Sequence, residues 1–423
     1  MAEIFHYPSD LDALVSSSWP ADVPPAPFAD CRRAVLEVAY HASMLREEGR
    51  PVRARIALAR PSDLRASLPS APDGPLVLRL DRTRPFDVDE LRRISVAAPF
   101  ETSVVAIAPD DHGELRIWGI VATGAQWLAP TWGGRRRGEP AVPGCVVHVR
   151  GPARISVHAG ERFIAGLEGG RLVTLRTDVF ESRWMPELFA GARDEFVRGH
   201  DARRQDDGHG DWPAITGSLV IAVSQQMVRR ALWLMREAHH GGTLVFVEPD
   251  EAEALFATVL RAKYRFTEGP ARTRYRMLLR GITGALAEAR GEATTLDASD
   301  FLHHTGTLTD LEAAIFELSR TIAWLSGVDG AVVLSKRFEL LAFGVEIGNA
   351  SGGPRRVYRA LDSEGEHTVD DDEENVGTRH RAAYRFAQAH PRGLAIVVSQ
   401  DGTIRFVACR NGRVTYYEQH VAG

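Results

Sequence analysis

Residues 328–335 read VDGAVVLS, and residues 377–383 read GTRHRAA. In the first stretch, Asp329 and Gly330 stand directly before an apolar run, which predicts a buried strand with a carboxylate at its entrance. In the second, Thr378 stands where a helix is expected to begin, and its hydroxyl is of the type that caps a helix N-terminus. These two stretches therefore predict a strand and a helix, each with a polar residue at its start.

The same two stretches carry groups that suit phosphoryl transfer. Arg379, His380 and Arg381 add cationic or donor side chains to a helix start, where free backbone N–H groups attract anions. Asp329 offers a carboxylate oxygen of the kind that Mg²⁺ or Mn²⁺ binds, and Gly330 lets a ligand approach the backbone. Taken singly, each feature has a plainer interpretation, because an aspartate before a strand is commonly a turn residue and a basic helix start is commonly a solvated face.

Outward from these stretches, helices and strands alternate. Helical periodicity covers residues 221–240 and 308–326, and a further helix is expected over residues 378–390. Short apolar runs bounded by glycine or polar residues predict strands between the helices. The alternation predicts an α/β domain. The expected strands are TLVFVEP from Thr243, GAVVLS from Gly330, LLAFGVEI from Leu340, LAIVVS from Leu394 and TIRFVAC from Thr403.

The first half of the chain has a different pattern. A helix over residues 29–48 and strands over residues 52–59, 75–80, 103–108 and 114–122 predict an α+β domain. Short apolar runs between glycines and prolines over residues 126–177 predict a small antiparallel sheet or meander. The charged stretch over residues 193–211 has few apolar residues and is interpreted as a linker. We therefore expect an N-terminal domain over residues 1–207 and a C-terminal domain over residues 208–423.

The DGA segment followed by the GTRHRAA segment resembles the signature of the diadenylate cyclase (DAC) family. The flanks are similar to the branch typified by the DNA-integrity scanning cyclase, in the run ALWLMREAHHGGTLVFVE, the turn Gly344-Val345-Glu346-Ile347 and the final segment VVSQDGTIRFV. The resemblance covers residues 217–420, about half of the chain. It implies a C-terminal diadenylate cyclase domain, with a mixed sheet flanked by helices, behind an α+β sensor-like domain.

The resemblance also implies an activity. Two ATP molecules are condensed into cyclic di-AMP with release of two pyrophosphates, Mg²⁺ or Mn²⁺ assists, and two domains face each other in a homo-dimer or higher homo-oligomer. Asp329, Arg379, His380 and Arg381 would be catalytic, with Asp329 and His380 near the metal. Gln400 stands where some branches of the family carry a carboxylate. The residues implied to bind ATP are Gly330, Ala331, Gly344, Val345, Ile347, Gly377, Thr378, Ser399 and Gln400.

The first two hundred residues contain no nucleophile motif, P-loop or metal cluster. REEGRPVRARIAL, over residues 46–58, resembles one group of sensor domains attached to diadenylate cyclases, but this resemblance names no ligand. In the C-terminal half, residues 248–304 form a longer insert than the family core requires. Its helical part, RYRMLLRGITGALAEAR, is interpreted as a packing or dimer helix, with a regulatory lid as the alternative.

Composition limits the classes of partner. With 51 Lys and Arg against 56 Asp and Glu, the net charge is −5, so the chain has no global positive field for nucleic acid or an anionic membrane. Nearly all the cations are arginines, with lysine only at Lys263 and Lys336. The three cysteines have neither metal-ligand nor disulfide spacing, and neither a signal peptide nor a long apolar run is visible, so we expect a cytoplasmic protein without a membrane segment.

Several other features have plainer interpretations. The acidic run over residues 370–374 is interpreted as a solvated loop rather than a metal store. Arg135-Arg136-Arg137, near Trp127 and Trp132, fits a surface hairpin better than a nucleotide clamp, and the His239-His240 and His303-His304 pairs fit structural roles. Two alternative functions stay open: a catalytically silent nucleotide or cyclic-dinucleotide receptor of the same fold, and a scaffold with a vestigial pocket.

Overall fold

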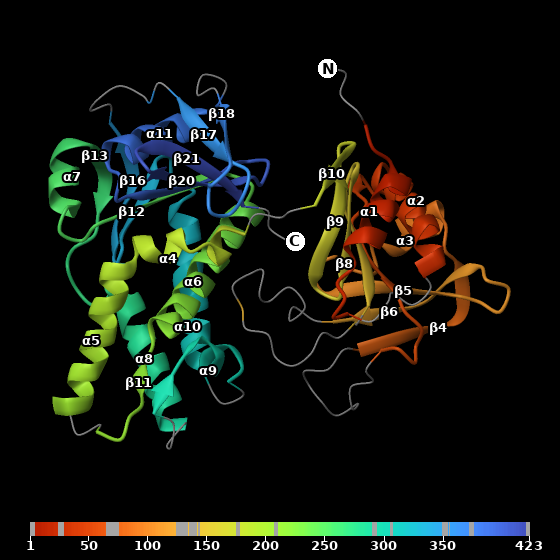
Figure 1. Ribbon diagram of the computed structural model, residues 1–423, viewed down its shortest axis with the longest axis horizontal. Helices are drawn as coiled ribbons and strands as arrows, with labels where there is room; N and C mark the ends of the chain where they lie inside the picture. The colour runs from red at the N-terminus through yellow and green to blue at the C-terminus, as the bar shows by residue number, and fades with distance from the viewer. Residues whose placement is uncertain are drawn as a thin grey trace. The chain divides into compact units, whose positions relative to one another are not determined.

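The computed structural model describes residues 5–23, 29–64, 76–123, 134, 142, 144–174, 178–206, 210–289, 294–304, 308–348, 354, 356–371 and 376–419. The chain forms two compact units (Figure 1). The first consists mainly of residues 1–131 and 136–176, and the second mainly of residues 177–421. Each unit is a sheet covered by helices, so the expected α/β class is confirmed.

The sheet of the first unit has eight strands in the order β10-β9-β8-β7-β3-β5-β6-β4. β3 and β5 are parallel, and the other neighbours are antiparallel. The expected meander is present as β7 to β10. It is not a separate sheet, however, because β7 pairs with β3 and extends the same sheet. The strands are β3 (Ala54–Leu58), β4 (Leu76–Pro85), β5 (Ser103–Pro109), β6 (Leu115–Ala122), β7 (Cys145–Gly151), β8 (Arg154–Ala159), β9 (Arg162–Glu168) and β10 (Arg171–Val173).

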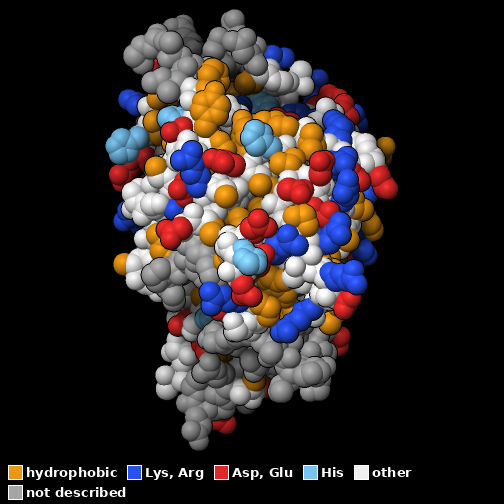
Figure 2. All heavy atoms as spheres, turned by 90° about the vertical axis from the view of Figure 1, so that its right-hand side faces the viewer, with side chains coloured by type: hydrophobic (Ala, Val, Ile, Leu, Met, Phe, Trp, Pro, Cys, Tyr) orange, Lys and Arg blue, Asp and Glu red, His pale blue; other side chains and the backbone are white. Residues whose placement is uncertain are grey.

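Three helices share a core with one face of this sheet: α1 (Pro8–Ser18), α2 (Arg32–Ser43) and α3 (Val88–Ile94). The helix expected to reach residue 48 ends at Ser43. Beyond it, Glu48 and Gly49 have positive φ angles of 48° and 80°, which form the turn of a hairpin between β1 (Arg46–Glu47) and β2 (Arg50–Pro51). On the face drawn in Figure 2, basic and acidic side chains are interspersed, in keeping with the nearly balanced charge of the chain.

The sheet of the second unit has nine strands in the order β13-β16-β15-β12-β19-β20-β21-β17-β18. It is mixed, as expected, because β12 runs parallel to β15 and antiparallel to β19. All five strands expected in this half are present, whereas β13, β17, β18 and β21 were not among them. The strands are β12 (Gly242–Val247), β13 (Leu260–Arg265), β15 (Ala331–Ser335), β16 (Leu340–Ile347), β17 (Val357–Ala360), β18 (Thr368–Asp371), β19 (Leu394–Val398), β20 (Ile404–Arg410) and β21 (Arg413–Gln419).

Helices cover both faces of this sheet (Figure 1). Leu244 and Phe246 of β12 point into a core shared with α6 (Gly217–Glu237), α8 (Arg274–Ala289), α9 (Ala298–Leu302) and α10 (Thr309–Leu325). Val245 and Val247 point the other way, toward α7 (Ala252–Thr258) and α11 (Thr378–Ala389). Because every β12 side chain is buried on one face or the other, the strand is continuously apolar in sequence.

The expected linker is instead a helix. α5 (Ala190–Asp206) follows α4 (Trp184–Leu188), and both belong to the second unit, which begins near residue 177 rather than at 208. Phe196 and His200 bury one side of α5, while the rest of this helix is polar enough to read as a linker. In the insert, α8 buries Leu278, Ile282 and Leu286 in the core, so the packing-helix interpretation holds over the lid. A short parallel pair, β11 (Ala214–Ile215) and β14 (Thr295–Leu296), completes the unit.

Within the described part of the chain, none of the helices combines the length and the apolar character that crossing a membrane requires.

Candidate active site

Strand register brings the separate sequence motifs to one edge of the second sheet. Thr243, near the start of β12, pairs with Ala331 at the start of β15 and with Val397 near the end of β19. Asp329 and Gly330 therefore enter the sheet at the edge where Ser399 leaves it. Since neighbouring strands lie about 4.8 Å apart, these two points are separated by about 10 Å across the start of β12.

A glycine contact fixes the DGA turn against β16. Gly330 has φ of 115°, and a Cβ at this position would lie 2.6 Å from the Gly344 carbonyl carbon and the Val345 nitrogen. Ala331 pairs with Val345, so the turn of β16 lies beside the DGA segment as the family resemblance implies. Ile347 ends β16 two residues further on, at the same edge, and is half-buried. A larger side chain at residue 330 would push these backbones apart.

The start of α11 differs from the expectation in one respect. Gly377 is the N-cap residue, and its carbonyl accepts hydrogen bonds from the backbone nitrogens of His380 and Arg381 at 3.1 and 3.2 Å. Thr378 is the first helical residue, so the prediction that it caps the helix is wrong. Glycine at the cap satisfies the backbone geometry without a side-chain acceptor. Arg381 donates from Nη1 to the Val376 carbonyl at 2.9 Å, which turns part of its guanidinium toward the segment before the helix.

Arg379 lies over the entrance of β12. Its Nη1 is 3.0 Å from the point that a Cβ on Gly241 would occupy, and the Val398 carbonyl oxygen and the Gln400 nitrogen are 3.0 and 3.4 Å from that same point. Gly241 also has φ of 66°, a conformation that favours glycine. The glycine thus allows the guanidinium to approach the exit of β19. Gly241 was not among the site residues predicted from the sequence, although its position before β12 was a usable signal.

His380 is a neutral side chain at pH 7. Its Nε2 lies 3.4 Å from the Ser399 hydroxyl, which joins α11 to the end of β19. Burial, followed by the nearby positive charge of Arg405, lowers the pKa of His380 to about 4. The ring therefore carries one N–H and one free acceptor nitrogen. Arg405 is itself held by Glu418, to which it donates at 2.8 Å, and it lies over the Tyr416 ring at 4.6 Å.

Asp329 is exposed to solvent at the entrance of β15. Among the described residues there is no group of three or more His, Cys, Asp and Glu side chains arranged to hold a metal ion. One carboxylate nevertheless suits Mg²⁺, which usually keeps several waters and takes its remaining ligands from substrate phosphates. The neutral imidazole of His380 is chemically able to act as a further ligand or as a hydrogen-bond acceptor.

The other candidates lie away from this constellation or outside the described residues. Asp370 and Asp371 belong to β18, where Asp370 accepts from Arg356 at 3.2 Å and Asp371 accepts from the Tyr416 hydroxyl. Residues 372–374 of the acidic run are outside the described residues, as are residues 135–137 with Trp127 and Trp132. His240 donates from Nδ1 to the Gly241 carbonyl.

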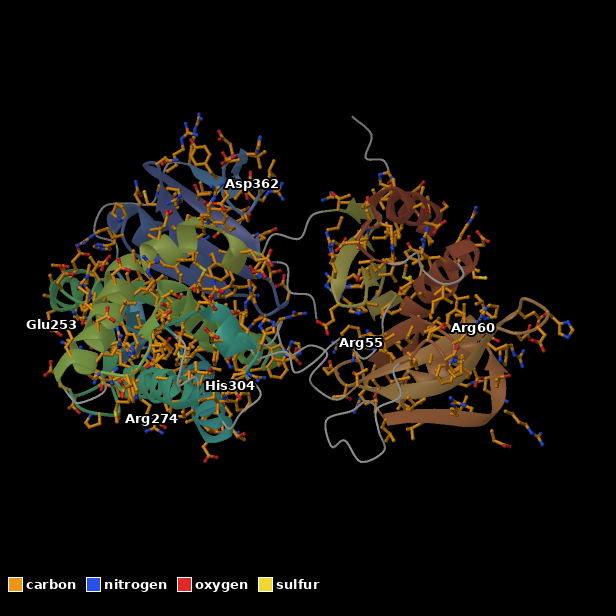
Figure 3. All side chains as sticks on the ribbon, turned by 60° about the horizontal axis from the view of Figure 1, so that its bottom comes forward. Arg55, Arg60, Glu253, Arg274, His304 and Asp362 are labelled. Carbon is orange, nitrogen blue, oxygen red and sulfur yellow. The ribbon has the colours of Figure 1, made fainter. Side chains whose placement is uncertain are left out.

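A buried polar cluster in the first unit was not anticipated from the sequence. Arg55 of β3 is fully buried and pairs in register with His148 of β7 (Figure 3). The His148 and His158 rings stack with centroids 3.8 Å apart, and Ser156 lies 3.1 Å from His158 Nε2. Burial lowers the pKa of Arg55 to about 9. The alternation of Arg55 with Ala54 and Ile56 was the available signal, because alternate strand residues face opposite sides of a sheet.

Part of the first unit matches a known family of domains. A family model described as "Probable sensor domain DACNV" matches residues 21–122. This range includes α2, α3 and β1 to β6, so this part of the first unit is similar to a probable sensor domain. None of the curated proteins matches the chain.

Two solved structures are similar to parts of the chain. One is a hypothetical membrane spanning protein from Bacillus cereus, 16% identical over 56% of this chain and 91% of that chain, with a TM-score of 0.23. The other is a double cysteine mutant of DacA from Staphylococcus aureus, 12% identical over 47% of this chain and 88% of that chain, also with a TM-score of 0.23.

Proposed function

We propose that this protein is a diadenylate cyclase that condenses two ATP into cyclic di-AMP and releases two pyrophosphates, under regulation by its N-terminal unit. The observation that carries the proposal is the meeting of three segments at one sheet edge. Ala331 of the DGA segment and Val397 of β19 both pair with Thr243, and His380 of the GTRHRAA segment lies 3.4 Å from Ser399, just after β19. The match of residues 21–122 to a probable sensor domain supports the regulatory part.

The reaction requires two identical substitutions at phosphorus. The ribose 3′-oxygen of each ATP forms a bond to the α-phosphorus of the other, the bond from that phosphorus to the pyrophosphate oxygen breaks, and the proton of each 3′-hydroxyl is released. Little covalent chemistry falls to the protein in such a transfer, so positioning and charge stabilisation carry the catalysis.

The residues of the edge divide these tasks. Arg379, beside the exit of β19, and Arg381 would neutralise the triphosphate, while Thr378 and Ser399 would donate hydroxyl hydrogen bonds to it. The flat floor formed by Gly330, Ala331, Gly344 and Val345 would lie against the nucleotide, with Ile347, Gly377 and Gln400 at its margin. Asp329, with His380, would hold Mg²⁺ or Mn²⁺. When bound, the metal would withdraw charge from the reacting phosphate.

The second unit of each chain offers one such edge, whereas the product contains two equivalent phosphodiester links. The active species is therefore at least a pair of second units that face each other across an approximate two-fold axis. Two ATP molecules are bound per pair.

Mass spectrometry of the purified full chain, incubated with ATP and Mg²⁺ or Mn²⁺, tests the proposal. The expected products are cyclic di-AMP and pyrophosphate in a ratio of one to two. If dinucleotide or ATP binds tightly without turnover under either metal, the silent-receptor alternative replaces the cyclase. If no nucleotide binds at all, the pocket is vestigial and both proposals fail.

A further inference from the structure

An aromatic cavity lies in the second unit, at the opposite edge of the sheet from the candidate active site. It has a volume of about 60 Å³ and lies between α4, α5, α6 and α8, beside Phe246 near the end of β12 and Lys336 just after β15. All the residues that line it are described. β12 begins at Gly242 and β15 follows Gly330, so both strands run between the candidate active site and this cavity.

The walls of the cavity are aromatic. The Phe189 and Phe338 rings stack with centroids 5.5 Å apart, and Phe246 stands edge-on to Phe189 at 5.5 Å and to Phe338 at 5.7 Å. Tyr275 of α8 lies 4.7 Å from Phe338, and its hydroxyl is 2.6 Å from the Ser224 hydroxyl of α6. These rings offer a small apolar body several π faces and edges at once.

The rim of the cavity is cationic. Arg276, near the start of α8, and Arg337 both donate to the carboxylate of Glu195, at 3.0 and 2.7 Å. Glu195 comes from α5, and its side chain is 36% exposed, so solvent reaches this ion pair. Although burial alone would raise it, the hydrogen bonds from the two arginines lower the pKa of Glu195. The carboxylate is thus held ionised between two guanidinium groups that line the cavity.

Few apolar side chains anchor the helix that supplies this carboxylate. Of its seventeen residues, Phe196 and His200 are buried and Val197 is partly buried, whereas most of the others are charged or small. His200 contacts the Pro213 carbonyl oxygen at 3.1 Å. A helix with so few buried apolar contacts belongs among the elements that open first in a folded protein. α5 is therefore suited to move outward from the cavity.

We propose that this cavity is a binding site for a small aromatic carboxylate. The carboxylate of the ligand replaces that of Glu195 on Arg276 and Arg337, and its ring lies among Phe189, Phe246 and Phe338. A cavity that binds benzene in another protein measures about 150 Å³, so a ligand of this size enters only as α5 moves outward. Glu195 acts as an internal competitor for the ligand.

The site offers a route of regulation. α4 and α5 are the first helices of the second unit, and displacement of α5 changes the segment that follows the first unit along the chain. The same ligand contacts the end of β12 and the turn after β15. The opposite ends of these two strands lie at the candidate active site. The binding inference is independent of the proposed cyclase activity, whereas this regulatory consequence rests on it.

Titration of the full chain with benzoate, followed by NMR of the ligand, tests the binding inference. Benzamide, which has the same shape without the charge, serves as the neutral comparison. We expect saturable binding of benzoate and at least about tenfold weaker binding of benzamide, because a charge-assisted hydrogen bond contributes about 1.5 to 3 kcal/mol. Equal affinities for the two compounds, or no saturable binding of benzoate, would overturn the proposal.

Two variants and a matched control locate the site. Arg276→Gln is expected to weaken benzoate binding about tenfold, whereas Arg280→Gln, an exposed position one turn along the same helix, should leave it unchanged. Glu195→Gln should tighten binding, because the competing carboxylate is gone. Equal effects of the two arginine variants, or weaker binding in Glu195→Gln, would contradict the proposed exchange. These binding measurements require no turnover, so their outcome does not depend on whether the protein is a cyclase.

Discussion

Substitution of Gly330 by alanine tests the contact that fixes the candidate active site. Alanine would adopt φ of 115° only with strain, and its Cβ would lie 2.6 Å from two backbone atoms of β16. Such a backbone conformation costs a non-glycine residue about 1 to 3 kcal/mol. Pushing a methyl group into a packed region costs a further 1 to 3 kcal/mol or so. The expected loss is therefore about 2 to 6 kcal/mol in the free energy of unfolding of the second unit.

Gly269 provides a matched control in the same unit. Its φ is 153°, also a conformation that favours glycine, but a Cβ there would meet nothing within 4 Å. Gly269→Ala should therefore carry only the backbone cost, about 1 to 3 kcal/mol. The difference between the two variants isolates the steric contact between the DGA turn and β16.

Urea unfolding of the full chain measures both effects. Tryptophan fluorescence and circular dichroism should be recorded together, because a chain of two units need not unfold in one transition. If Gly330→Ala and Gly269→Ala lose the same free energy, the proposed close approach of β15 and β16 is wrong. We also expect Gly330→Ala to lose most of its cyclic di-AMP synthesis at temperatures where it stays folded, since the nucleotide floor would be displaced.

The other predictions concern chemistry, pH and assembly. Asp329→Asn should nearly abolish product formation without a change in the free energy of unfolding, because the exposed amide keeps the shape of the carboxylate but loses its charge. Near-normal product formation across a metal titration would show that Asp329 does not hold the metal. Arg379→Ala and His380→Ala should each weaken ATP binding, measured by calorimetry, as well as turnover; an unchanged affinity would restrict them to the transition state. The pKa of His380 is lowered to about 4 in the folded state, so as pH falls the unfolded chain binds this proton first. The free energy of unfolding should therefore fall as pH falls from about 6.5 toward 4, and it should fall less steeply in His380→Gln. Specific activity of a truncated chain that starts at residue 178 should rise steeply with protein concentration. Light scattering checks the mass of the active species. A monomer whose specific activity stays constant at high dilution would contradict the two-site mechanism.

The motifs of the second unit could be located from sequence because local signals and tertiary burial agree there. Apolar runs such as LAIVVS form β19, which is buried on both faces, so continuous hydrophobicity was a reliable guide. The helix boundaries of α10 and α11 were also close to those expected. The cap of α11 was assigned to Thr378 rather than Gly377, because a threonine hydroxyl is the commoner cap and glycine leaves no side-chain signal.

Other features depend on contacts that no local pattern records. The sequence of α5 is so polar that it did not predict a helix. Phe196, His200 and the ion pairs of Glu195 hold this helix in place, and the partners they contact are distant in sequence. The pairing of β7 with β3 joins strands separated by about ninety residues of chain, which turned an expected separate meander into one sheet. The position of Arg379 over Gly241 likewise results from tertiary packing of α11 against β19.

The chain contains only two lysines, and the fold gives them opposite environments. Lys263 packs against Gly344 at the candidate active site and its side chain is 45% exposed, whereas Lys336 beside the aromatic cavity is 3% exposed and donates to Glu248 at 2.7 Å. An amine-selective reagent therefore has one accessible side-chain target, and it stands beside the proposed nucleotide floor. Acylation of Lys263 would report occupancy of that floor without any engineered label, while acylation of Lys336 would test whether α5 moves outward as proposed.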